Sequence, residues 1–268
     1  MKMIDCIVDT SKKENIQIFG MQKCGSGTIS RYCSLFDNLI WHGHGCFLRE
    51  DLISKSSYPN PGVVNDRYSN RQGGPWSSFK IHDSKISIGI IRNPYDLLLS
   101  FYFHSSAGSN NVAKYYEHGP QRNSTIEGFK KFIMSLEDIG RNKFPLFNLS
   151  CFYPYYDEAG NFKADYALKL SAINKIIELR GGWSDRVGRS TIESLEHKSN
   201  KPELPMEKIY DIGMIEVIKS KFCYELETFG YKFKQSDDRI IISRSDIPDL
   251  STSKIDNFHR SLSRRGGY

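Results

Sequence analysis

A short apolar run that passes through a glycine-rich turn into a helical pattern constrains the fold more than any other feature of the chain. The run from Ile16 to Phe19 reads Ile-Gln-Ile-Phe and is followed by Gly20. Beyond the turn, apolar residues recur with the i, i+3, i+4 and i+7 spacing of one helix face, at Ile29, Tyr32, Cys33 and Phe36. The sequence therefore predicts a strand, a turn and a helix in succession.

A second strand and helix follow the same plan from Ile86 onward. Residues 86–91 read Ile-Ser-Ile-Gly-Ile-Ile, which is the pattern of a buried strand. Asn93 suits the cap of the next helix and Pro94 suits its first position. We expect this helix to extend to about His104.

Weaker patterns continue the alternation of strands and helices. Apolar spacing and stop signals predict strands at 39–42 and 166–170 and helices at 126–136, 172–179 and 207–228. Gly230 is expected to end the last helix. The side chains of that helix expected to point inward are Ile209, Val217, Ile218 and Phe222. Strands that alternate with helices favour an α/β fold around a central parallel sheet flanked by helices.

The length and composition favour a single domain over residues 1–268. With 268 residues and 39% hydrophobic content, the chain can bury a sizeable core. The polar stretches 105–111 and 196–205 are interpreted as loops inside that domain. The polar tail at about 251–268 is expected to be flexible.

Charge and hydropathy narrow the expected partners and compartment. The 37 Lys and Arg residues exceed the 31 Asp and Glu residues, and the net charge of +6 weakly favours anionic ligands. Because the basic residues are dispersed, no nucleic-acid partner is expected. Residues 1–13 are too polar for a signal peptide, and no apolar run approaches the roughly 20 residues of a membrane span, so we expect a cytoplasmic protein without such a span. Six cysteines without CxxC spacing are expected to be free thiols there.

The turn from Gly20 to Thr28 has the chemistry of an anion site. Glycines let successive backbone N–H groups converge on one anion, the start of the helix adds partial positive charge, and Lys23 adds a full charge. The residues expected to grip a nucleotide phosphate are Lys23, Cys24, Gly25, Ser26, Gly27 and Thr28. Because Gly27 rather than a lysine precedes Thr28, the turn is not a Walker A loop, and magnesium-dependent NTP hydrolysis is disfavoured. The alternative interpretation is a tight turn with a surface lysine.

The end of the second strand offers another cationic group. Arg92 follows the strand directly, and Ser100 lies two turns into the next helix. A guanidinium and a hydroxyl can hold a second phosphate, and open α/β sheets bind ligands at the carboxyl ends of their strands. The alternative interpretation places Arg92 in a surface salt bridge and Ser100 on a solvated helix face.

Taken together, the two segments resemble motifs of the sulfotransferase family, which uses 3′-phosphoadenosine 5′-phosphosulfate. Gln22-Lys-Cys-Gly-Ser-Gly-Thr28 resembles the family's 5′-phosphosulfate loop, and Arg92-Asn-Pro94 with Ser100 resembles its 3′-phosphate motif. This chain departs from the family pattern at Gly27, where many members have Thr, and at Ser171, where many have Glu.

Two further segments are similar to the carbohydrate-modifying branch of that family, which includes heparan sulfate 2-O-sulfotransferases. The segment from Trp41 to Phe47 resembles a His-Gly-His segment of the branch. The segment from Tyr210 to Tyr231 resembles its C-terminal helix, which ends in Phe-Gly-Tyr. The resemblance covers about residues 16–104 and 205–231.

The resemblance implies a P-loop-NTPase-like three-layer fold and a sulfuryl transfer to the hydroxyl of a small-molecule or glycan acceptor. It implies that Lys23 neutralises the leaving oxygen and that Arg92 and Ser100 hold the 3′-phosphate. A histidine suits the role of base because its pKa lies near neutrality. His44 is the first candidate and His42 the second, because both are expected at a strand end and both match the His-Gly-His segment of the family, and His82 is a third.

Other residues invite functional interpretations that compete with simpler ones. His42, His44 and Cys46 alternate along an extended segment as zinc ligands can, but no fourth ligand is evident and no metal is expected. Lys198 and Lys201 could meet an anionic acceptor or close over the donor, and the alternative is a solvated run of charges.

Two other functions stay open. A nucleotide kinase-like phosphoryl transferase would need a Walker lysine and an acidic metal ligand at a strand end, and neither is visible. A non-catalytic module that binds adenosine 3′,5′-bisphosphate is kept open by the unusual Ser26-Gly27 pair. The segments at 54–75 and 105–121 are expected to shape the acceptor pocket, but the sequence specifies neither the acceptor nor the oligomeric state.

Overall fold

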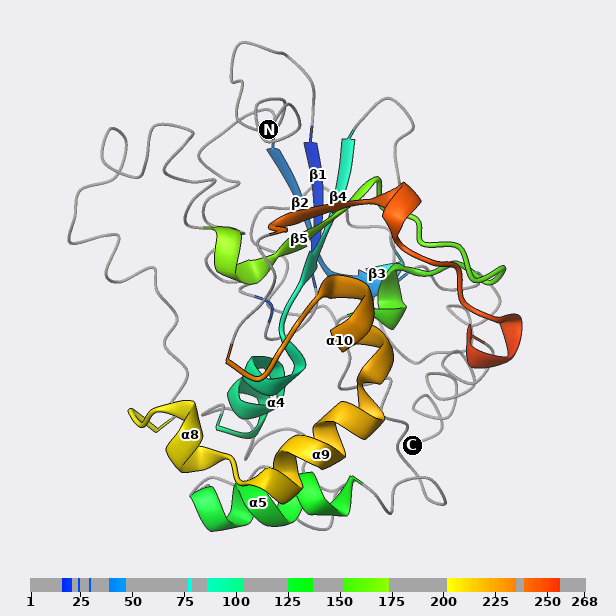
Figure 1. Cartoon of the computed structure of the whole chain (residues 1–268). Helices are drawn as coiled ribbons and strands as arrows, with labels where there is room; N and C mark the ends of the chain where they lie inside the picture. The colour runs from blue at the N-terminus through cyan, green and yellow to red at the C-terminus, as the bar shows by residue number, and fades with distance from the viewer. Residues whose placement is uncertain are drawn as a thin grey trace, which may run out of the picture. The chain divides into compact units, whose positions relative to one another are not determined.

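Figure 1 presents the structure, a computed structural model of the chain. The residues that it describes are 16–20, 24, 29, 39–46, 77–78, 86–103, 125–136, 152–173, 202–234 and 239–255. Within 39–46 and 77–78, and at Pro154, the description covers the backbone alone. Most of the helix predicted at 172–179 lies outside the described residues, as do the segments at 54–75 and 105–121.

The chain divides into two compact units, each built from separate stretches of sequence. The sheet unit comprises Met1–Ile91, Cys151–His197 and Ile240–Tyr268. The helical unit comprises Arg92–Ser150 and Lys198–Arg239. The expectation of a single domain over the whole chain stays a prediction.

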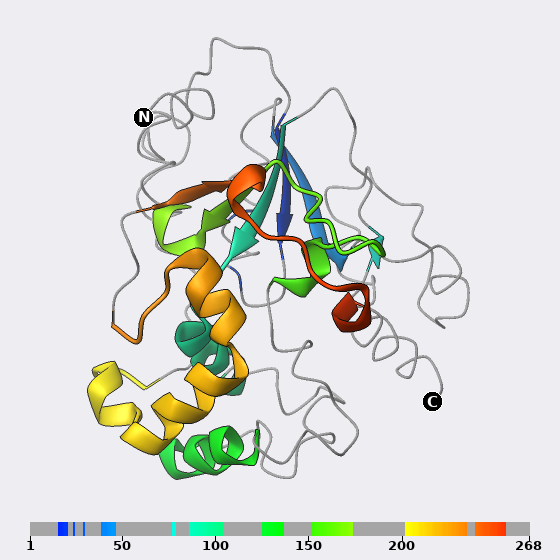
Figure 2. The ribbon, with the colours of Figure 1, turned by 45° about the vertical axis from the view of Figure 1, so that its right-hand side comes forward.

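The sheet unit contains a six-stranded sheet with the order β3-β2-β1-β4-β5-β6. Figures 1 and 2 show β2, β1 and β4 side by side, with β5 and β6 beyond β4. The strands are β1 Ile16–Gly20, β2 Leu39–Cys46, β3 Ser77–Ser78, β4 Ile86–Ile91, β5 Tyr166–Lys169 and β6 Ile241–Ser243. The prediction of an α/β fold is therefore confirmed.

The sheet is mixed, which corrects the expectation of a purely parallel one. Strands β1 to β5 pair in parallel, whereas β6 pairs antiparallel with β5. After β5 the chain turns into the short 3₁₀ helix Leu170–Ala172. The polar sequence that precedes β6 carries no periodic pattern that would reveal this last strand.

Burial explains why the apolar runs form the central strands. All five residues of β1 and the last five of β4 are buried. Ser87, the polar residue near the start of β4, is accommodated by Asp165, because its backbone N–H and its hydroxyl donate to Asp165 Oδ2 at 2.8 and 2.6 Å. A buried polar group with such partners costs little free energy of folding.

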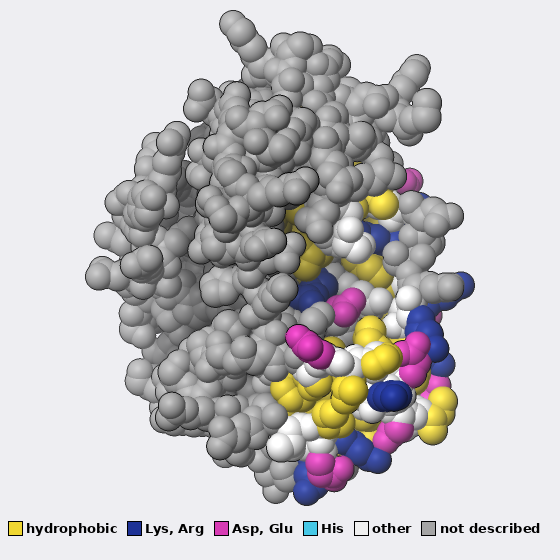
Figure 3. Space-filling view, turned by 90° about the vertical axis from the view of Figure 1, so that its left-hand side faces the viewer, with side chains coloured by type: hydrophobic (Ala, Val, Ile, Leu, Met, Phe, Trp, Pro, Cys, Tyr) yellow, Lys and Arg dark blue, Asp and Glu magenta, His cyan; other side chains and the backbone are white. Residues whose placement is uncertain are grey.

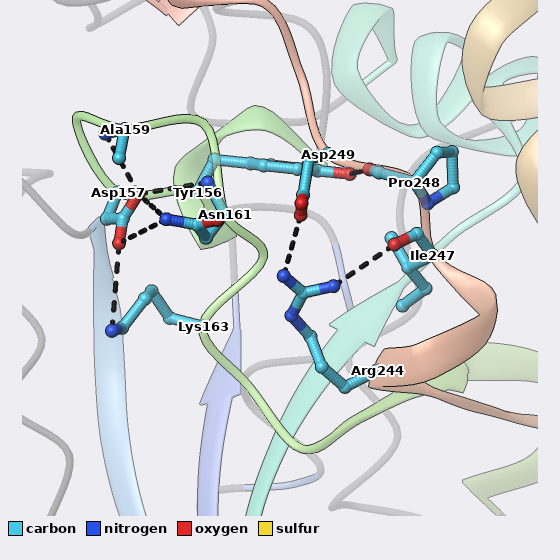
Figure 4. A network of polar contacts seen from close by, with 9 residues as sticks. All are labelled: Tyr156, Asp157, Ala159, Asn161, Lys163, Arg244, Ile247, Pro248 and Asp249. Carbon is cyan, nitrogen blue, oxygen red and sulfur yellow. Dashed lines mark hydrogen bonds and ion pairs between the residues drawn. The ribbon is translucent and has the colours of Figure 1, made fainter.

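Polar contacts also secure the segment that follows β6 (Figure 4). The Arg244 guanidinium donates to the backbone oxygen of Ile247 at 3.1 Å and to Asp249 Oδ1 at 2.6 Å. Farther along, Leu250 donates its backbone N–H to the oxygen of Gly160 at 2.8 Å. Residues 251–255 are the described part of the expected flexible tail, and Ile255 among them is buried.

The helical unit begins with α4 Pro94–Tyr102 and continues with α5 Ile126–Ser135. The Asn93 side chain accepts a hydrogen bond from Tyr95 N, and Thr125 accepts one from Gly128 N, so both helices start at capping residues. Both helices confirm their predictions to within about two residues at their ends.

The single helix predicted at 207–228 is instead three helices, which corrects that expectation. They are α8 Met206–Ile209, α9 Ile212–Lys221 and α10 Cys223–Phe229. The first break arises because Asp211 has extended backbone angles and its side chain caps α9 by accepting from Met214 N. Gly230, with φ of 63°, ends α10 as predicted.

Aromatic rings form the centre of the helical unit. Phe129 of α5 lies 5.3 Å from Tyr102 and 5.4 Å from Tyr210, measured between ring centroids. Hydrophobic side chains also reach the surface of the described residues (Figure 3), and the exposed large ones are Met134, Leu204 and Ile212. Within the described ranges, none of the helices has the length and apolar character needed to cross a membrane.

Candidate functional site

The strand order reverses direction between β1 and β4. From β1 the chain proceeds outward through β2 to β3, and it then returns to β4 on the other side of β1 and proceeds to β5 and β6. In β1 and β4, Ile16 lies beside Ile86 and Phe19 beside Gly89, so the two strands end at the same edge of the sheet. Open α/β sheets bind ligands outside the carboxyl ends of the strands at such a reversal.

Both predicted anion-binding segments leave the sheet from these two strands. The glycine-rich turn follows Gly20, the last residue of β1. Arg92 follows Ile91, the last residue of β4. Both motif segments therefore begin at the carboxyl ends of neighbouring strands.

Most of the turn itself lies outside the described residues. This applies to Lys23, Gly25, Ser26, Gly27 and Thr28. Cys24 is described: it is fully buried and its thiol is free. The phosphate cradle stays a prediction.

The two histidines proposed as base lie inside a strand, which corrects their expected place after a strand end. Strand β2 extends to Cys46, four residues beyond the predicted end, so His42 and His44 belong to it. The backbone of His44 pairs with Gly20, the residue that precedes the turn. His44 is thus placed by its backbone at the edge where β1 ends. His82 lies outside the described residues.

Arg92 and Ser100 are described, and neither lies on an open surface. Arg92 is half-buried. Ser100 is 5% exposed within α4, which rules out the solvated helix face considered from the sequence. Lys198 and Lys201 lie outside the described residues.

Arg92 acts electrostatically on a buried phenol of the helical unit. The Tyr210 hydroxyl donates to the backbone oxygen of Tyr95 at 2.6 Å. Burial raises the pKa of Tyr210 well above its usual value, Asp96 and Tyr95 raise it further, and Arg92 acts in the opposite direction. The guanidinium therefore exerts its positive charge next to the start of α4.

Two residues at this edge were missed by sequence reasoning. Lys169 is the last residue of β5, lies beside Ile91 in register and is fully buried. A buried lysine is rare and signals a specific environment. The end of the otherwise apolar Tyr-Ala-Leu-Lys run could have revealed it.

Tyr155 is the second missed residue. It ends the 3₁₀ helix Tyr153–Tyr155, and its hydroxyl contacts the backbone of both β1 and β4. Its sequence neighbourhood, Phe-Tyr-Pro-Tyr-Tyr, has no periodicity that indicates such a role. Only the folded arrangement reveals it.

The carboxyl ends of β1, β4 and β5 are Gly20, Ile91 and Lys169. Among the described residues, no group of three or more His, Cys, Asp and Glu side chains could hold a metal ion. Comparison with family models, curated proteins and solved structures found no match for this chain.

Proposed function

We propose that the chain is a sulfotransferase that moves a sulfuryl group from 3′-phosphoadenosine 5′-phosphosulfate to an acceptor hydroxyl. The observation that carries the proposal is the reversal of strand order between β1 and β4. Each of the two motifs that resemble the donor site of that family follows one of these two strands. A P-loop-NTPase-like three-layer arrangement of the sheet unit is part of the same proposal.

In the proposed reaction the acceptor oxygen attacks sulfur in line. A new sulfur–oxygen bond forms, the bond between sulfur and the donor phosphate oxygen breaks, and adenosine 3′,5′-bisphosphate leaves. Lys23 and the backbone N–H groups of the turn stabilise the charge that develops on the leaving oxygen. Arg92 and Ser100 bind the 3′-phosphate, whose binding energy holds the reacting sulfur in place.

His44 is the proposed base that accepts the proton of the acceptor hydroxyl. Its backbone pairing with Gly20 favours it over His42, because the reacting sulfur has to lie beside the turn that follows Gly20. We expect His44→Ala to lose turnover and to keep the affinity for adenosine 3′,5′-bisphosphate. Unchanged turnover would remove His44 from this role.

Thermal unfolding with different nucleotides tests the proposal. A ligand that binds only the folded chain raises its melting temperature, and at about 100 times Kd the stabilisation is roughly 2.7 kcal/mol. For a chain of this size this corresponds to a shift of about 5–10 °C. We expect the shift with adenosine 3′,5′-bisphosphate but not with AMP or with ATP and magnesium.

Two arginine variants sharpen this test. Arg92→Ala should abolish most of the shift, whereas Arg239→Ala removes an exposed arginine of the same unit and should leave it intact. Equal shifts with ATP and magnesium favour the phosphoryl transferase instead. A bisphosphate shift without turnover on glycan, phenol or peptide acceptors favours the non-catalytic binding module.

A further inference from the structure

The Tyr155 hydroxyl joins the ends of the two strands that flank the reversal. It donates to the backbone oxygen of Ile90 at 2.7 Å and lies 3.2 Å from that of Phe19. A phenol has one proton, so the shorter contact is the main hydrogen bond and the longer one is the weaker arm of a shared bond. Tyr155 is fully buried, so bulk water does not compete for these bonds.

The ring of Tyr155 is held in place by a glycine in β4. A Cβ atom at Gly89 would lie 3.2 Å from three atoms of the ring, which is closer than ordinary van der Waals contact. Only a residue without a side chain lets the ring lie this close to the strand. Gly89 also pairs with Phe19 in β1, so the ring and its hydroxyl lie over the junction of the two strands.

Both oxygen atoms belong to the penultimate residue of their strand. Phe19 precedes Gly20, after which the glycine-rich turn begins, and Ile90 precedes Ile91, after which Arg92 follows. The ends of strands fray more readily than their centres. A bond across this position fixes the spacing between the points where the two anion-binding segments leave the sheet.

We infer that Tyr155 is a positioning residue for the donor site. This inference rests on the proposed function, because it assigns to Tyr155 the spacing between the end of β1 and the end of β4, after which the two motif segments follow in the sequence. Tyr155 does not touch the donor; it acts through the backbone of Phe19 and Ile90. A site whose parts are held in advance loses less conformational entropy when the ligand binds, so the bond raises affinity for a ligand with two phosphates.

The variant Tyr155→Phe tests the inference in the full chain. It removes one oxygen atom and keeps the ring against Gly89. We expect the Kd of adenosine 3′,5′-bisphosphate, measured by titration calorimetry, to rise about three- to tenfold. We also expect faster amide hydrogen exchange in peptides covering residues 16–24 and 86–93 without ligand.

The neighbouring Tyr156 provides a matched control. It is also fully buried, and its hydroxyl donates to the backbone oxygen of Pro248 at 3.0 Å (Figure 4). Tyr156→Phe therefore removes the same kind of bond within the same unit, away from β1 and β4. It should lower the melting temperature about as much as Tyr155→Phe and change neither the Kd nor the exchange at the two strand ends.

Each outcome bears on one of the two claims. If the wild-type chain binds the bisphosphate and Tyr155→Phe binds equally well, the positioning role is overturned and the proposed function stands. If the wild-type chain does not bind, the proposed function is overturned and the donor role of Tyr155 with it. Equal exchange in both variants contradicts the strand-end bond itself.

A second variant covers the case in which Tyr155→Phe does not fold. Gly89→Ala presses on the ring and displaces the hydroxyl by a few tenths of an ångström without removing it. We expect it to weaken bisphosphate binding in the same direction as Tyr155→Phe. Unchanged binding in Gly89→Ala would then overturn the inference.

Discussion

In both the sheet unit and the helical unit, buried tyrosine hydroxyls form hydrogen bonds between segments that are distant in the sequence, but these bonds have different structural roles. In the sheet unit, Tyr155 adds a bond to strands that already pair along their length. In the helical unit, Tyr210 donates to the Tyr95 oxygen, and Tyr95 donates to the Ile215 oxygen at 3.4 Å, which joins α4 to α9 through side chains. The comparison indicates that the loss of a hydroxyl in the helical unit acts on stability alone, whereas the loss at Tyr155 also changes the local geometry of the two strand ends.

The largest loss in the free energy of unfolding is expected from Phe129→Ala in the helical unit. Phe129 is fully buried among the rings of Tyr102, Phe103 and Tyr210, and a cavity at such a site costs about 3–5 kcal/mol. Urea denaturation measures the loss, and hydrogen exchange locates it. An equal loss of hydrogen-exchange protection in the sheet unit would contradict the difference between the two units. As a control, Phe101→Ala removes a half-buried ring and should lower the free energy of unfolding by less.

The next largest effect is expected from Gly160→Ala in the sheet unit. Gly160 has φ of 84°, and an added Cβ would clash with the backbone oxygen of Leu250. We expect a loss of about 2–3 kcal/mol in the free energy of unfolding, because the conformation is strained for alanine and a backbone atom must move. In Gly128→Ala the closest atom is instead the Tyr102 hydroxyl, and the gain in helix propensity offsets part of the cost. A larger loss at Gly128 than at Gly160 contradicts this ranking.

A smaller loss of stability is expected in the helical unit at high pH. Burial, and then the charge of Glu216, raises the pKa of Tyr95 from 10.0 to about 12. Since the folded state holds this proton more tightly, the stabilisation is complete below pH 10 and is lost as the pH rises towards 12. Between pH 10 and pH 12, the melting temperature of the wild type should fall by on the order of 3 °C more than that of Tyr95→Phe. If the melting temperatures of the two proteins fall equally with pH, ionisation of Tyr95 is not linked to stability.

The smallest loss of stability is expected at Asp211, where two variants separate the contribution of the helix cap from that of the ion pair. Its Oδ1 accepts from Met214 N at 3.0 Å, and its Oδ2 lies 2.6 Å from Lys130 Nζ on α5. Asp211→Ala removes the cap of α9 and should cost about 1 kcal/mol, whereas Asp211→Asn keeps an acceptor and should cost a few tenths. Chemical denaturation of both variants measures the difference. Equal losses would mean that the ion pair, and not the cap, joins α5 to α9.

Local patterns predicted the elements whose signals are local. Strand β4 was predicted at its observed bounds, and β1, α4 and α5 to within about two residues, because apolar periodicity and capping residues act over short distances. The break at Asp211 was missed because the apolar pattern continues across it. The end of β2 was missed because strands disfavour glycine, and Gly43 and Gly45 lie in its second half.

The residues of the candidate site also fall into two groups, those with a local sequence signal and those without one. Arg92 was found because it follows a recognisable strand. Tyr155 was not found because its partner Phe19 lies 136 residues away, and no sequence pattern encodes that contact. The antiparallel β6 was missed because its apolar run, Ile240-Ile-Ile242, is only three residues long, and its pairing with β5 is what identifies it as a strand.

The late position of β6 has a consequence for biosynthesis. The sheet unit draws its last strand, Ile241–Ser243, from the C-terminal part of the chain, after the helical unit has been synthesised. Until those residues emerge, β5 presents an unpaired edge, and such an edge is a template for pairing with another chain. A nascent chain interrupted before residue 241 therefore lacks β6, the strand that pairs with this edge of β5. Translation has to pass β6 before the edge is protected from pairing with other molecules.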